Sequence, residues 1–274
     1  MKGVRYYIKF ALLILYSVIQ LYPLYWLFTF SLKTNAEIYG QNILGLPHQW
    51  RWSNYLRVLQ SSTIIRYFLN SVLYSAITLA VVAVVATMAS YAISRMQWKL
   101  KGLAYSLFTI GIMIPTHAAL LPLFQVISKL GLKGGYTGLL IPYIAFGIPM
   151  SVMIITGFFR TIPKELEEAA YMDGCGTFKT FFMIMVPMVK PSIATASIFT
   201  FLNTWNELLF ANTLVDSNRF RTLPVGIMSF AGQYSTDWGL IGAGMVIATL
   251  PTIIIYTLLS NQVQNSLVVG AVKG

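Results

Sequence analysis

Charged residues are scarce in this sequence. Only 10% of its 274 residues are charged, whereas 57% are hydrophobic. A soluble domain carries about a quarter charged residues, so this chain could not cover a globular surface with polar groups. The composition therefore excludes an ordinary soluble enzyme, and it also excludes a disordered chain.

Cysteine and histidine are almost absent as well. The single cysteine, Cys175, excludes an internal disulfide framework and a multi-cysteine metal site. The histidines, His48 and His117, lie far apart and offer no helical spacing for metal ligands. The sequence also lacks a Gly-x-x-x-x-Gly-Lys phosphate loop followed by Ser or Thr, so it does not bind ATP in that way. We expect no cofactor, no bound metal and no catalytic residue.

Positive charge exceeds negative charge, with 19 Lys+Arg against 8 Asp+Glu and a net charge of +11. A nucleic-acid footprint needs a clustered basic face, but these charges are spread over every loop between apolar runs. Such flanking charge is typical of membrane proteins. We therefore expect contact with membrane lipid and no nucleic-acid partner.

Long apolar runs dominate what remains. A spanning helix needs roughly 20 apolar residues, and in lipid each segment must pair its own backbone groups. The pattern predicts an all-α polytopic membrane protein with six transmembrane helices, forming a single transmembrane domain over residues 1–274. The expected spans cover residues 10–30, 69–91, 103–125, 137–158, 191–213 and 239–260.

The charges around the first run predict its orientation. The run after Lys9 is longer than the apolar core of a signal peptide and has no small-residue cleavage site, so we expect an uncleaved helix. Basic residues cluster before it and again over Arg95–Lys101. Because cytoplasmic loops carry an excess of Lys and Arg, this distribution predicts a cytoplasmic N-terminus.

The segment at about 160–190, between the fourth and fifth expected spans, is polar and holds four of the acidic residues. Pro163 suits a first helical turn, and Gly174 suits a left-handed C-terminal cap. The predicted helix has about eleven residues and a length of roughly 16 Å, too short to span a membrane. One face, mostly of small residues, would let a partner approach: Leu166, Ala169, Ala170 and Asp173.

A second short helix is expected after Gly174. Phe178, Phe181, Phe182 and Met185 recur at helical spacing, and we expect Pro187 to end this helix. Two interpretations of the whole segment remain open. It either lies on the lipid headgroups as an amphipathic linker, or it docks a cytoplasmic protein.

A longer motif runs through the same segment. Glu168-Ala169-Ala170 is followed, after three residues, by Gly174, then by Ile184 and Pro187 at the spacing of the EAA signature. The chain thus resembles the permeases of ABC importers. The resemblance implies that the segment is a cytoplasmic coupling helix seated in a groove of the ATP-binding subunit. The implied contact residues are Glu168, Ala169, Ala170, Asp173, Gly174 and Pro187.

Other motifs resemble the carbohydrate branch of that family. They include Leu69-Asn70-Ser71, Ser90-Tyr91-Ala92 with Arg95, Trp205-Asn206-Glu207, Thr222–Gly226 and the C-terminal Gly270–Gly274. Together they resemble the second, six-helix permease subunit of maltose-type importers. That group imports oligosaccharides and other sugars, and also glycerol-phosphate compounds.

The resemblance also implies an assembly in the bacterial plasma membrane. Its expected partners are a second permease subunit, two ATP-binding subunits, an extracytoplasmic solute-binding protein and a sugar substrate. The loop over residues 216–237 would reach the binding protein through Gly226, Gly232, Gln233 and Tyr234, or else serve only as a solvated connector. The tail Gly270–Gly274 would enter the interface between the ATPase subunits, or else be a frayed end.

Glu207 is the one acid inside an apolar run. We expect it about sixteen residues into the fifth helix, roughly 24 Å from its start, on one face with Asn203 and beside Asn206. An ionisable residue within the membrane is a functional-site hypothesis, because amides and a carboxylate can bind sugar hydroxyls and Trp205 can stack on a sugar ring. The alternative is a polar clamp between helices, with Trp205 in the interfacial aromatic belt.

Two other classes of function compete. An ion-coupled secondary transporter usually shows repeats, broken helices and several buried ionisable residues, whereas this sequence shows no repeat and one candidate, Glu207. A membrane enzyme would need a catalytic motif, and we find neither a paired-histidine metal motif nor a Gly-x-Ser-x-Gly turn.

Overall fold

The computed structural model describes residues 2–40, 42–232 and 235–271. Within these ranges the chain is helical, apart from turns and one isolated antiparallel bridge between Ala231 and Thr236. Contacts divide the chain into two compact units. Unit 1 holds Met1–Arg66 with Leu223–Pro251, and unit 2 holds Tyr67–Thr222 with Thr252–Gly274. The prediction of an all-α polytopic protein is confirmed.

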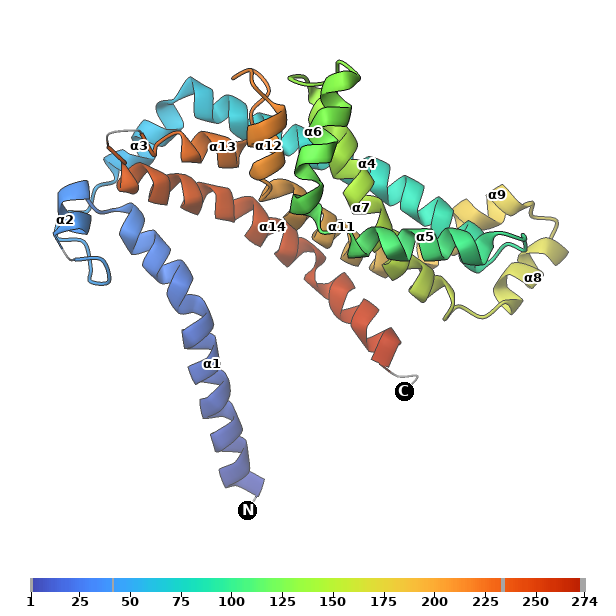
Figure 1. The fold of residues 1–274 in the computed structure, drawn as a ribbon. Helices are drawn as coiled ribbons and strands as arrows, with labels where there is room; N and C mark the ends of the chain where they lie inside the picture. The colour runs from blue at the N-terminus through green and yellow to red at the C-terminus, as the bar shows by residue number, and fades with distance from the viewer. Residues whose placement is uncertain (1, 41, 233–234, 272–274) are drawn as a thin grey trace. The chain divides into compact units, whose positions relative to one another are not determined.

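Unit 1 begins with the long helix α1, Lys2–Ser31, drawn in blue in Figure 1. Its other helices are α2 (Asn35–Tyr39), α3 (Ser53–Gln60), α13 (Leu223–Met228) and the first part of α14 (Trp238–Ala271). Residues 6–24 of α1 carry exposed side chains and are mostly apolar, as expected of a lipid-facing helix.

A buried amide joins the helices of unit 1. Asn54 Nδ2 donates to the carbonyl oxygens of Ser31 at 2.9 Å and Lys33 at 3.1 Å, where α1 ends. Gly239 lies against the same groups, and a Cβ there would stand 2.6 Å from Asn54 Nδ2. The start of α14 can therefore approach α1 and α3 this closely only because it carries glycine.

Unit 2 contains most of α4 (Ser62–Ser94), which precedes a series of shorter elements. In chain order these are α5 (Lys101–Met113), η1 (Thr116–Ala119), α6 (Leu120–Lys129), α7 (Tyr136–Phe159), α8 (Glu165–Met172), α9 (Thr177–Thr180), the π-helical turn η2 (Phe181–Met185), α10 (Val186–Met188), α11 (Lys190–Trp205) and α12 (Leu209–Leu214). Helix α7 packs against both α5 and α11.

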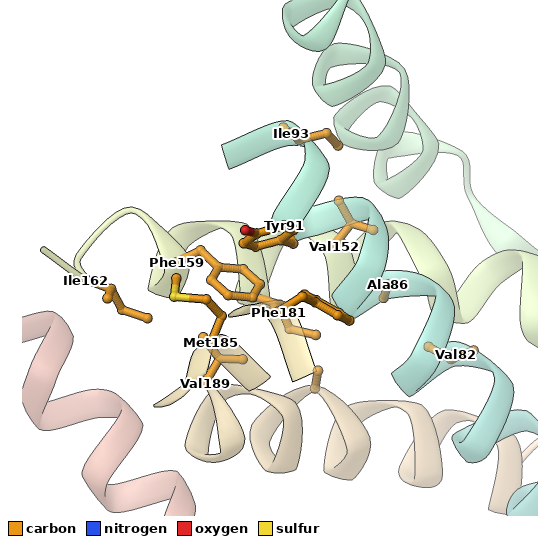
Figure 2. Packing of buried hydrophobic residues seen from close by; sticks show 12 residues of the cluster. Val82, Ala86, Tyr91, Ile93, Val152, Phe159, Ile162, Phe181, Met185 and Val189 are labelled. Carbon is orange, nitrogen blue, oxygen red and sulfur yellow. The ribbon is translucent and has the colours of Figure 1, made fainter. Parts of the chain in front are cut away.

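The core of unit 2 lies where α4, α7 and η2 meet (Figure 2). Tyr91 packs its ring against Phe181 and Phe159, with centroids 5.0 and 5.7 Å away. Val152 and Met185 are fully buried beside them. Between helices in lipid, close packing of this kind is the main source of association, so this cluster holds α4 to the segment that leads into α11.

Four helices are long and apolar enough to cross a membrane as single rods: Tyr6–Ser31, Ser62–Ser94, Tyr136–Phe159 and Trp238–Gln262. Two further candidates are bent pairs. Lys101–Met113 and Thr116–Lys129 meet at 91°, and Thr177–Met188 and Lys190–Trp205 meet at 72°. The described residues thus supply up to six spans.

Two expected spans are not continuous helices, and those predictions are wrong in detail. The helix expected over 103–125 breaks at Ile114, whose ψ of 116° is extended, because the following Pro115 disfavours helical geometry at that residue. The helix expected over 191–213 ends at Trp205. Pro187 does not end the preceding helix, since α10 continues to Met188.

Candidate functional site

Glu207 occupies the break between α11 and α12, not the interior of a helix as its sequence position predicts. Its Oε1 accepts a hydrogen bond from the Phe210 N–H at 2.7 Å, and its Oε2 accepts one from the Ala211 N–H at 3.0 Å. These N–H groups belong to the first turn of α12 and have no partner inside that helix. The carboxylate therefore replaces the missing helical partners and lets the chain break at this point.

A third bond ties Glu207 to another helix. The hydroxyl of Tyr143, in α7, donates to Glu207 Oε2 at 2.9 Å. Tyr143 is itself buried, and its ring meets that of Tyr74 edge to face. The polar clamp considered for Glu207 is thus present in the structure, and it links α7 to the α11–α12 break.

A cavity of about 420 Å³ opens beside this clamp, a volume within the range of small-molecule sites. Parts of η1, α7, α11 and α12 form its wall. The polar side chains in its lining are Thr116, His117, Tyr143, Thr200, Asn203, Thr204, Asn206 and Glu207. Asn203 and Glu207, expected on one face, are therefore brought together here, with Asn206 beside them.

Trp205 lies elsewhere. It is only 3% exposed and does not line the cavity. Its ring stacks on Phe201 with centroids 5.5 Å apart and meets Phe68 edge to face at 5.7 Å. Stacking on a sugar would require Trp205 to leave this packing.

The helix predicted in the polar segment is present as α8, Glu165–Met172, which is shorter than expected. Gly174 has φ of 77°, as predicted for a left-handed cap. The Gly174 N–H donates to Tyr171 O at 3.0 Å, and the Cys175 N–H donates to Ala170 O at 2.9 Å. This pair of bonds is the Schellman motif, and it turns the chain sharply toward α9.

One expected feature of α8 is wrong. Leu166, Ala169 and Asp173 are exposed, but Ala170 is only 4% exposed and faces the protein. The four residues therefore do not form a single accessible face. The cause is Glu167, which lies three residues before Ala170 and anchors that side of the helix inward.

Glu167 was not singled out from the sequence, yet it is the best-connected residue of α8. Its Oε2 lies 2.6 Å from Arg95 Nε, and both side chains are nearly buried. The Tyr91 hydroxyl donates to its Oε1 at 2.9 Å, and Arg95 also donates to Pro163 O at 3.1 Å. Local sequence pattern does not reveal this role, because the partners Tyr91 and Arg95 lie in or next to α4.

Four large apolar side chains from the end of α8 through η2 stand exposed. They are Met172 at 88%, Phe178 at 76%, Met183 at 66% and Phe182 at 58%. We call these four residues the α8–α9 apolar surface. Large apolar side chains that are exposed to this extent indicate a contact with lipid or with another protein.

The outer loop expected to meet a binding protein is described only in part. Gly226 lies buried within α13, and Gly232 is exposed, whereas Gln233 and Tyr234 lie outside the described residues. Of the C-terminal motif, Gly270 and Ala271 continue α14, and residues 272–274 lie outside the described part.

Comparisons of the sequence and the fold with known proteins assign the chain to a family. The profile of the family described as "Binding-protein-dependent transport system inner membrane component" matches residues 86–267. The chain belongs to this family. Membership makes it a membrane permease subunit of an ATP-binding-cassette importer, with ATP hydrolysed on a separate chain, and places it as a multi-pass protein in the plasma membrane.

Individual relatives cover nearly the whole permease. A probable ABC transporter permease protein of Bacillus subtilis, YurM, is 37% identical over 262 residues, which is 96% of this chain and 87% of that protein. The trehalose transport permease SugB of Mycobacterium tuberculosis is 32% identical over 93% of both chains. The trehalose/maltose permease MalG of Thermococcus litoralis is 32% identical, covering 95% of this chain and 94% of its own.

A solved structure shares the fold of the permease. It is a bacterial ABC transporter involved in the import of the acidic polysaccharide alginate, with a TM-score of 0.77 at 24% identity. The match covers 94% of this chain and 96% of that one.

Proposed function

We propose that this permease carries a carbohydrate, an oligosaccharide, across the bacterial plasma membrane. The observation that carries this proposal is the cavity beside Glu207, where amide, hydroxyl and carboxylate groups gather in an otherwise apolar chain. Sugar hydroxyls both donate and accept hydrogen bonds, so such a lining suits them. The names of the relatives, which include trehalose and maltose transport, support the same substrate class.

The proposal includes a five-part assembly. A second permease would complete the pathway, two ATP-binding subunits would drive it, and an extracytoplasmic binding protein would deliver the sugar. In this assembly Asn203, Asn206 and Glu207 contact the passing substrate, and Trp205 supports them from the packed side. The exposed Gly232, together with Gln233 and Tyr234, would meet the binding protein, with Gly226 holding the helix behind them.

The segment around α8 would couple ATP hydrolysis to transport. Glu168, Ala169, Asp173 and Gly174 form its outer side, while Ala170 supports it from within. The α8–α9 apolar surface would be covered by the ATP-binding subunit. The Arg95–Glu167 ion pair would then transmit a displacement of α8 directly to the end of α4. This arrangement requires the segment and the N-terminus to be cytoplasmic.

An ion-coupled mechanism is the main competitor. Glu207, the acid in the cavity lining, already accepts three hydrogen bonds from protein groups. With about one acceptor position left, this carboxylate is poorly placed to coordinate and release a coupling ion, which needs several oxygen ligands at once.

The deciding experiment is reconstitution of the permease with its native partners in proteoliposomes. We expect one sugar, presented by the binding protein, to raise ATPase activity and to accumulate in vesicles only when ATP is hydrolysed. Uptake that continues without ATP but stops when an ion gradient is collapsed would overturn the proposal.

A further inference from the structure

We propose that the cavity beside Glu207 selects neutral sugars and rejects anionic ones. This inference rests on the proposed function and narrows its substrate class. It concerns the charge of the cavity, which follows from the side chains that line it.

The lining carries negative charge without a compensating cation. Glu207 is its one carboxylate, and no lysine or arginine is among the described residues that form it. None of the ion pairs between described residues involves Glu207. The other titratable groups that face it are His117 and the Tyr143 hydroxyl. An anionic sugar entering here would meet a like charge with no cation in the described lining to offset it.

The three donors to Glu207 leave its charge in place. Two are backbone N–H groups and the third is the Tyr143 hydroxyl, so all three are neutral. An ionised carboxylate offers about four acceptor positions. One position therefore remains for a hydroxyl of the substrate, whereas the carboxylate group of an acidic sugar has no hydrogen to donate there and carries a like charge.

The remaining lining also suits a neutral sugar. Asn206 uses one amide N–H on Leu202 O at 2.9 Å, which leaves its amide oxygen and second N–H free to face a ligand. Phe146 and Phe210 contribute aromatic faces, and His117 lies against Phe210 with centroids 6.4 Å apart. Amides beside aromatic rings are the usual combination for binding a polar but uncharged ring.

The selection distinguishes this permease from its structural neighbour. That neighbour is involved in the import of an acidic polysaccharide, so a cavity that rejects anionic sugars would separate the two permeases by substrate charge. The same reasoning disfavours glycerol-phosphate compounds, which need basic groups to bind their phosphate.

The charge of the cavity can be measured without knowing the natural sugar. The native Cys175 is replaced by serine, Asn203 is replaced by cysteine, and the whole complex is placed in nanodiscs so that both faces are open. Cationic and anionic methanethiosulfonate reagents of similar size are then compared, each rate being divided by its rate with a free thiol. We expect a cation-to-anion preference of at least tenfold.

Two variants test whether Glu207 is the cause. Glu207→Gln removes the charge at nearly constant shape, and Asn206→Lys places a cation beside an intact Glu207. Both should lower the preference toward one, provided that the ATP-binding subunits still co-purify. Because Asn206 bonds only within its own helix, its variant remains informative if Glu207→Gln fails to assemble.

Several outcomes overturn the inference. A wild-type preference near one, a preference unchanged in both variants, or no reaction with either reagent would each do so. In a second arm, a mixture of neutral maltose, trehalose and cellotriose should protect the cysteine, and oligogalacturonates should not. Protection by the uronates, or none by the neutral mixture, contradicts the inference. Sugar-stimulated ATPase activity that persists in either case leaves the proposed function standing.

Discussion

Unit 2 holds two partly or fully buried glutamate carboxylates that differ in the groups that surround them. Glu207, in the α11–α12 break, accepts hydrogen bonds from three neutral donors, and no lysine or arginine is among the described residues that line its cavity. Glu167, in α8, lies 2.6 Å from Arg95 Nε and is neutralised. The ion pair of Glu167 with Arg95 fixes α8 to the end of α4. Glu207 has hydrogen-bond donors but no lysine or arginine beside it in the described lining, so it can still interact with a substrate. The comparison separates a mechanical joint from a binding site within one small unit.

The largest effect is expected from breaking the joint. Arg95→Ala leaves Glu167 buried without its cation, which costs about 3–5 kcal/mol. We expect a clear fall in the melting temperature of the complex and loss of the ATP-binding subunits on purification. Replacing both residues by methionine should restore much of the stability, because no unpaired charge is then buried.

The matched control is Arg57→Ala in unit 1. Its ion pair with Asp237 spans 3.2 Å, but the arginine side chain is 59% exposed. Exposed pairs contribute about 1 kcal/mol or less. If Arg95→Ala were as mild as Arg57→Ala, the buried pair would not be a structural joint.

A smaller effect is expected at the other carboxylate. Glu207→Ala leaves two backbone N–H groups and the Tyr143 hydroxyl without an acceptor, at a cost of about 1–3 kcal/mol for each group that water from the adjoining cavity does not reach. We expect transport to fall further than assembly, measured as sugar uptake against the amount of intact complex. Disappearance of the complex from membranes, at unchanged expression, would make Glu207 a purely structural clamp.

The turn after α8 gives a third, smaller effect. With φ of 77° at Gly174, a side chain costs roughly 1–2 kcal/mol. Gly174→Val should therefore loosen the ATP-binding subunit and slow sugar-stimulated hydrolysis while membrane insertion is unchanged. Gly176→Val is the control, because Gly176 has φ of −76° and a Cβ there meets open space. Equal behaviour of the two variants would contradict a role for the left-handed turn.

The smallest perturbation tests orientation alone. Lys179 is exposed at the end of α9, so Lys179→Cys should leave stability unchanged. In a Cys175→Ser background, we expect labelling by a membrane-impermeant maleimide only after cells are opened. Labelling of intact cells would place the joint and the α8–α9 apolar surface outside the cytoplasm.

Much of the fold follows from the sequence because long apolar runs have one solution in lipid. The runs around residues 10–30, 69–91, 137–158 and 239–260 all lie within continuous helices. The break at Pro115 was foreseeable, because proline restricts the residue before it. The break at Glu207 was not, because hydrophobic periodicity does not reveal that a carboxylate will serve the N–H groups of a following helix.

The candidate sites show the same limit. Gly174 could be predicted from its place after a helical pattern, because a left-handed cap is a local requirement. The partners of Glu167 and Glu207, namely Arg95 and Tyr143, lie in helices distant in sequence. Local propensity carries no information on such pairing, because the pairing depends on how α4, α7 and α8 pack in three dimensions.

The π-helical turn η2 has a consequence for how the α8–α9 apolar surface is aimed. It packs Phe181 and Met185 into the core, while Phe178 and Phe182 point outward. Such a turn contains one more residue than an α-helical turn, and each helical residue rotates the chain by about 100°. Losing one residue here would swing Phe178 by that angle relative to α11 without removing any apolar group. The number of residues in η2 therefore sets the direction that the α8–α9 apolar surface faces relative to α11. An insertion or deletion in this turn would rotate the surface and leave its side chains unchanged.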